Sequence, residues 1–350
     1  SQLGKWDWDA APHAEDDADK AIKTGEDARF YSLSAPLKKA VNNKGKDLIL
    51  AYSVQHSQNL DCGGAYIKLV KPGFEPKEFG GDTPYGIMFG PDVCGTGTRK
   101  THVIFTYDDD NHLTKKSVKC ETDNKPHLYA LFLNQDNTYS VRIDDKEVET
   151  GDLTEDFDML PPKEIKDPEA SKPKDWVDTP TMPDPEDEKP EGYDDIPAQI
   201  PDPDAEQPDD WDEEDDGEWE APLIDNPEYS GPWSPKMIKN PDYKGPWEHP
   251  MIPNPDFKED DNLHAVCSPC SHVGFELWQV KSGTLFDDIL VTDSAADYEA
   301  LAEAWTAKAD ALNEAADAAK KAEEEAAKAA AEAEEEEEDD EDDEDEHDEL

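Results

Sequence analysis

A 14-residue unit is repeated three times between Gly217 and Phe257, and no other feature constrains this chain as strongly. Each copy carries one tryptophan, a large apolar anchor, and one Asn-Pro pair, which favours a turn. A fixed period of this kind predicts an array of small units rather than one packed core. The repeated positions are Trp219, Trp233 and Trp247, and Asn226-Pro227, Asn240-Pro241 and Asn254-Pro255.

A second repeat, also in three copies, comes just before the first. Each copy starts with Ile or Met and has Asp-Pro at its third and fourth positions; the copies cover 165–176, 182–193 and 200–211. Three copies of one type followed by three of another predict an arm that runs outward, turns near Asp215-Asp216-Gly217 and returns. We expect a long hairpin, in which the last unit of the earlier type pairs with the first unit of the later type.

Composition divides the 350-residue chain into segments of different kinds. The 89 acidic and 33 basic residues give a net charge of -56, which argues against nucleic acid as a partner and makes cations the expected ligands. Residues 161–257 hold 21 of the 29 prolines, and 16 of the 19 residues from Glu332 to Leu350 are acidic. Neither segment can bury much apolar surface. No run of 18 apolar residues occurs, so no membrane insertion is predicted.

Apolar alternation predicts short strands on both sides of the arm. Because no helical pattern separates them, an antiparallel sandwich is expected. The predicted domains are one sandwich made of residues 1–160 and 258–293, an inserted arm at 161–257, and a C-terminal segment at 294–350. The predicted strands are 48–54, 65–70, 102–107, 127–133, 138–143, 274–280 and 284–291.

A helix is predicted to start after Ser294, which is its N-cap, with Asp297 at the capping-box position. Its apolar stripe should dock the first turns onto the sandwich. Beyond about Glu334, like-charge repulsion is expected to end the helix. The tail from Glu332 to Glu349 is expected to bind many Ca²⁺ ions weakly, or else only to keep the chain soluble. The stripe consists of Tyr298, Leu301, Trp305 and Leu312.

The last four residues match a retrieval signal of the endoplasmic reticulum, which the HDEL receptor recognises. They are His347, Asp348, Glu349 and Leu350. Such a signal presupposes entry through a removed leader and residence in an oxidising lumen. We therefore expect the protein to reside in the lumen of the endoplasmic reticulum. We also expect it to be a monomer. No catalytic triad, phosphate loop or paired-carboxylate site stands out, so no enzyme is predicted.

Both repeats, in this order, resemble the arm of the calreticulin and calnexin family of lectin chaperones. Three further motifs extend the resemblance over nearly the whole chain: Cys62-Gly-Gly-Ala-Tyr-Ile-Lys68, Tyr85-Gly-Ile-Met-Phe-Gly-Pro-Asp-Val-Cys94 and Leu277-Trp-Gln-Val-Lys-Ser-Gly-Thr284. The resemblance implies a mainly β, legume-lectin-like (concanavalin-type) jelly roll with an inserted proline-rich hairpin arm and an acidic C-terminal helix or disordered tail. It also implies a disulfide between Cys62 and Cys94, each of which flanks a strand motif.

By resemblance, the sandwich binds the terminal glucose of monoglucosylated N-glycans. Such a site needs apolar faces against C–H surfaces and fixed polar groups for the hydroxyls. Glu276 departs from the family's Asp, and its extra methylene shifts the carboxylate by about 1.5 Å. Alternatively, the tyrosines are ordinary surface aromatics and Trp278 is a core residue. The implied site residues are Tyr66, Lys68, Tyr85, Met88, Asp92, Glu276 and Trp278.

The resemblance also implies one tight Ca²⁺ site and one protein partner. Asp287 would supply the carboxylate, with backbone oxygens near Lys20; the alternative is an ordinary acidic loop residue. The arm tip would recruit a thioredoxin-fold protein disulfide isomerase, unless Trp219 only packs on the opposite limb of the arm. The implied tip contacts are Glu214, Asp216, Glu218 and Trp219.

Cys267 and Cys270 form a C-x-x-C motif that departs from the family pattern. It could be a redox pair or, with His264 and His272, a Zn²⁺ site. The absence of a thioredoxin-like context and the tight histidine spacing favour a small disulfide loop or inert thiols. Cys120, in a polar-alternating segment taken as a strand, is then expected to be a buried free thiol.

The predicted function is that of a calcium-binding lectin chaperone. It would hold monoglucosylated glycoprotein clients, present them to the isomerase on the arm and buffer luminal Ca²⁺. Two other classes compete with this prediction. One is a calcium-storage protein whose sugar site is weakened or lost, and the other is a dithiol oxidoreductase that uses Cys267 and Cys270.

Overall fold

The computed structural model describes residues 3–14, 16, 18–208, 211 and 217–345, and beyond residue 329 it describes the backbone alone. The chain divides into two compact units. One consists of Ser1–Pro161 together with Asp256–Leu350, and the other of Pro162–Pro255. The two units are described separately below.

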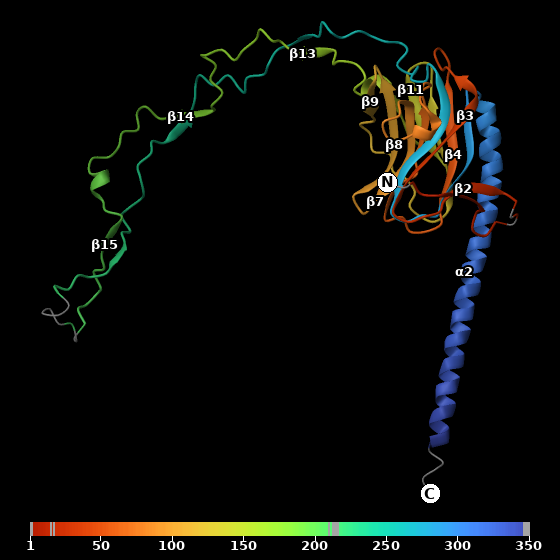
Figure 1. Ribbon diagram of the computed structural model, residues 1–350. Coiled ribbons are helices and arrows are strands. Elements are labelled where there is room, and N and C mark those ends of the chain that lie inside the picture. The colour runs from red at the N-terminus through yellow and green to blue at the C-terminus, as the bar shows by residue number, and fades with distance from the viewer. Residues whose placement is uncertain (1–2, 15, 17, 209–210, 212–216, 346–350) are drawn as a thin grey trace. The chain divides into compact units, whose positions relative to one another are not determined.

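The first unit contains two antiparallel sheets (Figure 1). Sheet A consists, in spatial order, of β1 (Trp6–Ala10), β2 (Lys20–Thr24), β20 (Thr284–Thr292), β4 (Leu48–His56), β10 (Pro126–Leu133), β11 (Thr138–Ile143) and β12 (Lys146–Asp152). Sheet B consists of β3 (Arg29–Val41), β19 (Cys270–Gln279), β5 (Cys62–Gly64), β7 (Tyr85–Cys94), β8 (Thr98–Tyr107) and β9 (Asp110–Leu113). The short strand β6 (Ile67–Val70) pairs with both β19 and β7. The predicted antiparallel sandwich is confirmed.

The core lies between the two sheets and follows the alternation of their strands. On β4, Leu50 and Tyr52 point into it, whereas Ile49 and Ala51 belong to a second apolar cluster on the other face of sheet A. Sheet B contributes its own inward-facing set to the core, at Ile67, Leu69, Ile87, Phe89, Val103, Phe105, Phe275 and Leu277. The other face of sheet B, which we call the outer face, therefore carries the alternate residues of these strands.

The first turns of helix α2 (Ala295–Asp345) pack against β4, β10 and β20, on the face of sheet A that points away from the core. Tyr298 and Trp305 pack there against Ile49 and Leu128, and all four side chains are buried. The helix begins as predicted, because the Ser294 hydroxyl accepts a hydrogen bond from the Asp297 amide at 3.2 Å. Its docking explains why β4 is buried on both faces and leaves the outer face of sheet B uncovered by the helix.

The prediction that this helix ends near Glu334 is wrong, because α2 continues to Asp345. Residues 334–345 are seven glutamates and five aspartates. Glutamate is a strong helix former, aspartate costs no more than about 0.7 kcal/mol per residue, and extending a helix that is already formed needs no new nucleus. Each like-charge pair one turn apart costs only about 0.2–0.5 kcal/mol. We infer that local propensity outweighs repulsion along this segment.

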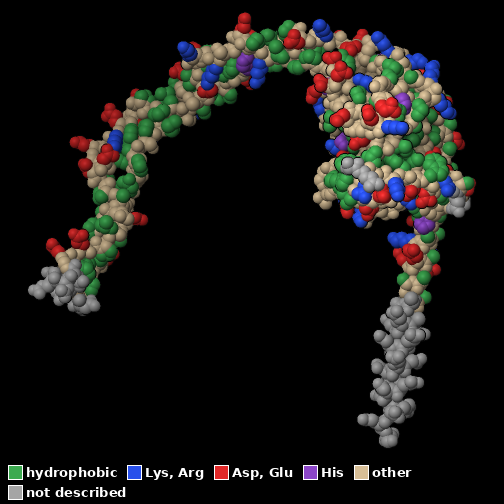
Figure 2. All heavy atoms as spheres, in the orientation of Figure 1, with side chains coloured by type: hydrophobic (Ala, Val, Ile, Leu, Met, Phe, Trp, Pro, Cys, Tyr) green, Lys and Arg blue, Asp and Glu red, His purple; other side chains and the backbone are tan. Residues whose placement is uncertain are grey.

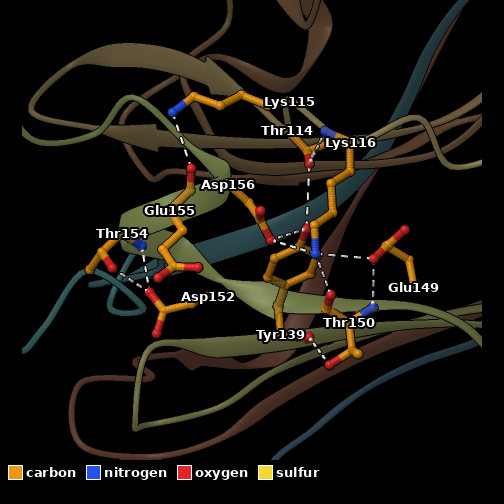
Figure 3. A network of polar contacts seen from close by, with 10 residues as sticks. All are labelled: Thr114, Lys115, Lys116, Tyr139, Glu149, Thr150, Asp152, Thr154, Glu155 and Asp156. Carbon is orange, nitrogen blue, oxygen red and sulfur yellow. Dashed lines mark hydrogen bonds and ion pairs between the residues drawn. The ribbon is translucent and has the colours of Figure 1, made fainter.

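The described residues also form three short helices: α1 (Leu153–Asp156) and η1 (Pro76–Glu78) in the first unit, and η2 (Tyr193–Asp195) in the second. Around α1, the Lys116 ammonium lies 3.0 Å from Asp156 Oδ2 and 3.1 Å from Glu149 Oε1 (Figure 3). Tyr139 donates its hydroxyl hydrogen to the same Asp156 oxygen at 3.0 Å. These contacts connect the loop after β9 to the edge strand β12 and to α1.

The second unit is a hairpin of three two-stranded ladders, as predicted (Figure 1). Each ladder pairs an element of the earlier repeat with one of the later repeat, in reverse order along the chain. The pairs are β13 (Glu164–Lys166) with β18 (Met251–Pro253), β14 (Thr181–Pro183) with β17 (Met237–Lys239), and β15 (Gln199–Pro201) with β16 (Leu223–Asp225).

The repeated residues of the arm make repeated hydrogen bonds across it. The Asn226 amide donates from its side chain to the Pro197 carbonyl, and Asn254 does the same to Pro162, both at 2.8 Å. Apolar side chains remain exposed along this unit (Figure 2), where Leu223 is 61% exposed. One glycine of each later repeat has a left-handed φ near +80 to +91°, which favours glycine: Gly217, Gly231 and Gly245.

Cys120 was expected to be buried within a strand, and both parts of that expectation need correction. It lies in the loop between β9 and β10 and is only partly buried. It is free, as predicted, and burial raises the pKa of its thiol to about 11. The polar alternation around it came from loop residues, which can imitate a half-buried strand in sequence.

Candidate functional site

The outer face of sheet B brings together residues from four strands. Lys68 of β6 is in register with Met88 on one side and with Gly274 on the other. Glu276 is two residues beyond Gly274, so it points to the same side as Lys68. Gly90 of β7 is in register with His102 of β8, which extends the same face outward.

Lys68 lies at the centre of this cluster. Its side chain is almost fully buried, and its ammonium lies 3.1 Å from Glu276 Oε2. The same ammonium lies 5.0 Å from the centre of the Tyr85 ring, within the range of a cation–π contact. Lys68 therefore holds a carboxylate and an aromatic ring in a fixed relation.

Asp92 and Tyr66 form the second part of the cluster, on either side of His102. The His102 Nε2 atom lies 3.0 Å from Asp92 Oδ2, and its ring meets the Tyr66 ring edge to face at 5.8 Å. His102 was not among the predicted site residues. The alternation of the predicted strand 102–107 indicated on which face of the sheet His102 lies, but it could not indicate which strand is adjacent.

The backbone at Tyr66 is held from inside the sandwich. The buried Tyr52 hydroxyl donates to the Ala65 carbonyl at 2.7 Å, and the Ala65 amide donates to Pro91. Gly90 has a φ of +128°, and a Cβ atom there would lie 1.7 Å from the Tyr52 hydroxyl. A side chain at this position would therefore displace the Tyr52 hydroxyl that holds the backbone just before Tyr66.

Trp278 lies on the same face, further along β19. Its ring packs against that of Phe30 on β3 with centroids 4.7 Å apart, and it is partly exposed. It is therefore not a core residue. The two rings extend the apolar surface of the outer face beyond Glu276.

Four polar groups of the cluster retain unused bonding capacity. Within the described residues, the hydroxyls of Tyr66 and Tyr85 have no hydrogen-bond partner. Asp92 and Glu276 each use one carboxylate oxygen in the contacts given above, and the other oxygen of each has none there. Burial, with the nearby Glu276 carboxylate, raises the pKa of both tyrosines, so they remain hydroxyl donors.

The predicted calcium residue Asp287 has a different environment. Its Oδ2 atom lies 2.9 Å from the Lys308 ammonium of α2. No group of three or more His, Cys, Asp or Glu side chains in the described part of the chain is arranged to hold a metal. Lys20 lies in β2, where its backbone pairs with Ala10. As arranged, the residues around Asp287 fit an ammonium and do not fit Ca²⁺, which requires six to eight oxygens.

The cysteines form two disulfides. Cys62 bonds to Cys94 across β5 and β7, as predicted, and Cys267 bonds to Cys270. The zinc alternative for the second pair is therefore not the arrangement found. His264 is instead held by protein groups, because its Nε2 accepts from the Gly45 amide at 3.2 Å and its Nδ1 lies 3.0 Å from Asn137 Oδ1.

Several predicted residues lie outside the described part of the chain. At the arm tip these are Glu214 and Asp216, whereas Glu218 is exposed and Trp219 is partly exposed. The four residues of the retrieval signal, His347, Asp348, Glu349 and Leu350, are also not described. For the tail from Glu332 to Glu349, only the helical backbone up to Asp345 is described.

Comparison with known families identifies the group to which this fold and cluster belong. The model of the calreticulin family matches residues 2–216 and 213–291. The chain belongs to the calreticulin family. Calreticulin from Chlamydomonas reinhardtii is 59% identical over 292 residues, covering 83% of this chain and 68% of that protein. Calreticulin from Onchocerca volvulus is 51% identical over 302 residues, covering 86% and 77%.

A solved calreticulin structure has the same fold. The globular domain of T. cruzi calreticulin matches with a TM-score of 0.64 and 29% identity, covering 91% of each chain. The predicted lectin-like β fold is thereby confirmed. Membership of the calreticulin family supports the role of a calreticulin-type lectin chaperone and a calcium-binding protein of the endoplasmic reticulum. Within the described residues, no helix is both long and apolar enough to span a membrane.

Proposed function

We propose that this chain binds monoglucosylated N-glycans on folding glycoproteins through the outer face of sheet B. The observation that carries the proposal is the convergence of Tyr66, Lys68, Tyr85, Asp92 and Glu276 on one face. Two tyrosine hydroxyls there, and one oxygen of each of the two carboxylates, have no protein partner among the described residues. A sugar hydroxyl both donates and accepts, so it complements this mixture.

The apolar members of the cluster have their own role in this proposal. Met88 and the Trp278–Phe30 pair would cover the C–H faces of the sugar, which must be removed from water as the hydroxyls bond. Lys68 would act through its neighbours, because its ammonium is already engaged by Glu276 and the Tyr85 ring. It would fix the directions of these groups before the ligand arrives.

The finer roles of the other segments belong to the same proposal. The arm tip, with Glu218 and Trp219 among its predicted contacts, would recruit a thioredoxin-fold disulfide isomerase. The tail from Glu332 to Glu349 would bind Ca²⁺ weakly and in large number, since clustered carboxylates attract hard cations. His347 to Leu350 would return the protein to the endoplasmic reticulum.

Glycan binding is tested by titrating the full-length chain with a monoglucosylated high-mannose glycan and with the same glycan lacking its terminal glucose. Tyr66→Phe and Tyr85→Phe each remove one hydroxyl, and each should weaken binding about tenfold, since one bond contributes roughly 1–1.5 kcal/mol. The control is Tyr107→Phe, whose hydroxyl bonds Asp260 at 2.8 Å and does not belong to the cluster.

The result also separates the lectin from its competitor, the calcium-storage protein with a weakened or lost sugar site. Tight, glucose-dependent binding that both cluster variants weaken supports the lectin. Equal binding of the two glycans, or equal effects of all three Tyr→Phe variants, rejects the proposed site. Glu276→Asp restores the family's residue and should bind at least as tightly as the parent chain.

A further inference from the structure

Three carboxylates converge on one ammonium where α2 crosses sheet A. Lys308 Nζ lies 2.8 Å from Asp19 Oδ2, 2.9 Å from Asp287 Oδ2 and 4.0 Å from Asp288 Oδ2. The three acids come from the segment before β2 and from β20, whereas the lysine comes from the helix. One side chain therefore connects three elements of the first unit.

Local backbone geometry sets the directions of the Asp288 and Lys308 side chains. The pairing of β20 with β4 shifts register between Asp287 and Leu290, and Asp288 has a left-handed φ of +53°. This irregularity turns Asp288 toward Ser53, whose hydroxyl donates to it at 2.9 Å. Lys308 follows the buried Trp305 by three residues, which is almost one helical turn, so both lie on the same side of α2. Packing of Trp305 on sheet A therefore places Lys308 next to the three aspartates.

The charges of the cluster explain why a cation is needed there. Three carboxylates that all lie within 4.0 Å of one ammonium repel one another, so a positive charge among them is favourable. The Lys308 ammonium lies among the three carboxylates and neutralises part of their charge.

The space left around the ammonium is small. A cavity of about 30 Å³ is lined by Asp19, Asp287, Asp288, Trp305 and Lys308, among others. Room of this size holds about one water molecule. A calcium ion would need six to eight oxygens at 2.3–2.6 Å, and the lysine already occupies the point where the carboxylates meet.

We propose that the Lys308 ammonium is the resident cation of the Asp19–Asp287–Asp288 cluster, in place of the tight calcium ion that the family resemblance implies at Asp287. The lysine joins α2 to sheet A and satisfies the carboxylates without metal. Its removal should uncover a site for divalent cations. This inference does not depend on glycan binding at sheet B.

The test uses Tb³⁺ as a calcium substitute and measures its luminescence after tryptophan excitation in the full-length chain. Trp305 lines the cavity, whereas the sequence contains no aromatic residue after it, so ions on the acidic tail contribute little. Lys308→Met is compared with Lys321→Met, which makes the same charge change on an exposed part of α2, where Lys321 lies 4.0 Å from Glu325. The double variant Lys308→Met/Asp287→Asn tests whether Asp287 holds the Tb³⁺ that Lys308→Met binds.

We expect Lys308→Met to bind Tb³⁺ at least tenfold more tightly than Lys321→Met, and added Ca²⁺ to displace it. Asp287→Asn in the Lys308→Met background should abolish the gain. Equal binding by the two lysine variants would overturn the proposal. So would tight binding in the parent chain that Asp287→Asn removes.

A second measurement on the unmodified chain covers the case in which Lys308→Met does not fold. Acetic anhydride labels exposed lysines, and mass spectrometry reports each site. In metal-free protein, Lys308 should react at least tenfold more slowly than Lys321, because its ammonium is held by the carboxylates. Equal labelling of the two lysines would contradict the proposal.

Discussion

Lys68 Nζ lies 3.1 Å from Glu276 Oε2, although 208 positions separate the two residues in the chain. The contact joins β6 to β19, which precede and follow the whole arm. The outer face of sheet B is therefore complete only after the chain returns from the arm. This relation makes the pair a direct probe of how the site is assembled.

Replacing both members of this pair should show strong coupling. Lys68→Met leaves Glu276, which is 21% exposed, without its cation, whereas Lys68→Met/Glu276→Gln removes both charges. We expect a coupling of about 1–3 kcal/mol in the free energy of unfolding, measured with urea. Lys38→Met, on an exposed position of β3, is the control and should change stability little. Simple additivity would show that the ion pair contributes nothing.

His56 should make stability fall on acidification. Burial lowers its pKa from 6.5 to about 4. Its Nδ1 lies 3.0 Å from Thr284 Oγ1, an oxygen that also accepts from Gln279, so a neutral imidazole is hydrogen-bonded in the folded chain.

In the unfolded chain this histidine binds a proton below about pH 6.5, but in the folded chain only near pH 4. The stabilisation is complete above pH 6.5 and is lost between pH 6.5 and 4, by up to about 3 kcal/mol. Urea unfolding across this range is the measurement. His56→Gln should flatten the slope, while the raised pKa of His127 acts in the opposite direction in both proteins. An unaltered slope would show that His56 does not carry the effect.

Removing the bridge between β5 and β7 should be costly. Cys62 and Cys94 are 32 residues apart, and the chain-entropy model assigns a loop of this length about 3–4 kcal/mol. The double variant Cys62→Ala/Cys94→Ala should lower the free energy of unfolding by this amount. Cys120→Ala removes an unbridged thiol and should cost about 1 kcal/mol or less. Thermal or urea unfolding of both variants separates the bridge from the loss of sulfur atoms.

Two adjacent lysines offer a matched comparison at α1 (Figure 3). Lys116 bonds Asp156, which is 13% exposed, whereas Lys115 pairs with Asp158, which is 84% exposed. Lys116→Met should destabilise by about 1–3 kcal/mol, because it leaves a mostly buried carboxylate without its cation, bonded only by the Tyr139 hydroxyl among the described contacts. Lys115→Met should cost only about 0–1 kcal/mol. Equal losses in urea unfolding would mean that burial of the carboxylate does not control the effect.

Much of the fold follows from local pattern. Alternation of apolar residues predicted strands at β4, β8, β10, β11, β19 and β20, because each has one face in the core. The repeats predicted the pairing of the arm, since a hairpin must match its units in reverse order. The end of α2 could not be predicted from local pattern, because its position depends on a balance between helix propensity and the repulsion of like charges.

The site was predictable only in part. Motifs indicated Tyr66, Lys68, Asp92 and Glu276 by resemblance, but no local pattern indicated His102, whose role depends on the register between β7 and β8. The same limit applies to Lys308 of α2, because the acids that it contacts lie on other elements: Asp19 before β2, and Asp287 in β20.

The amino-acid sequence alone determined the kind of each segment: a β sandwich interrupted by a repeat hairpin and followed by an acidic helix. Periodicity, proline content and charge act over a few neighbouring residues, so they can be read directly from the chain. Only the tertiary structure decided which side chains meet, because strand register and helix docking are set by packing across the whole core. For that reason, Glu276 is beside Lys68 and Asp287 beside Lys308.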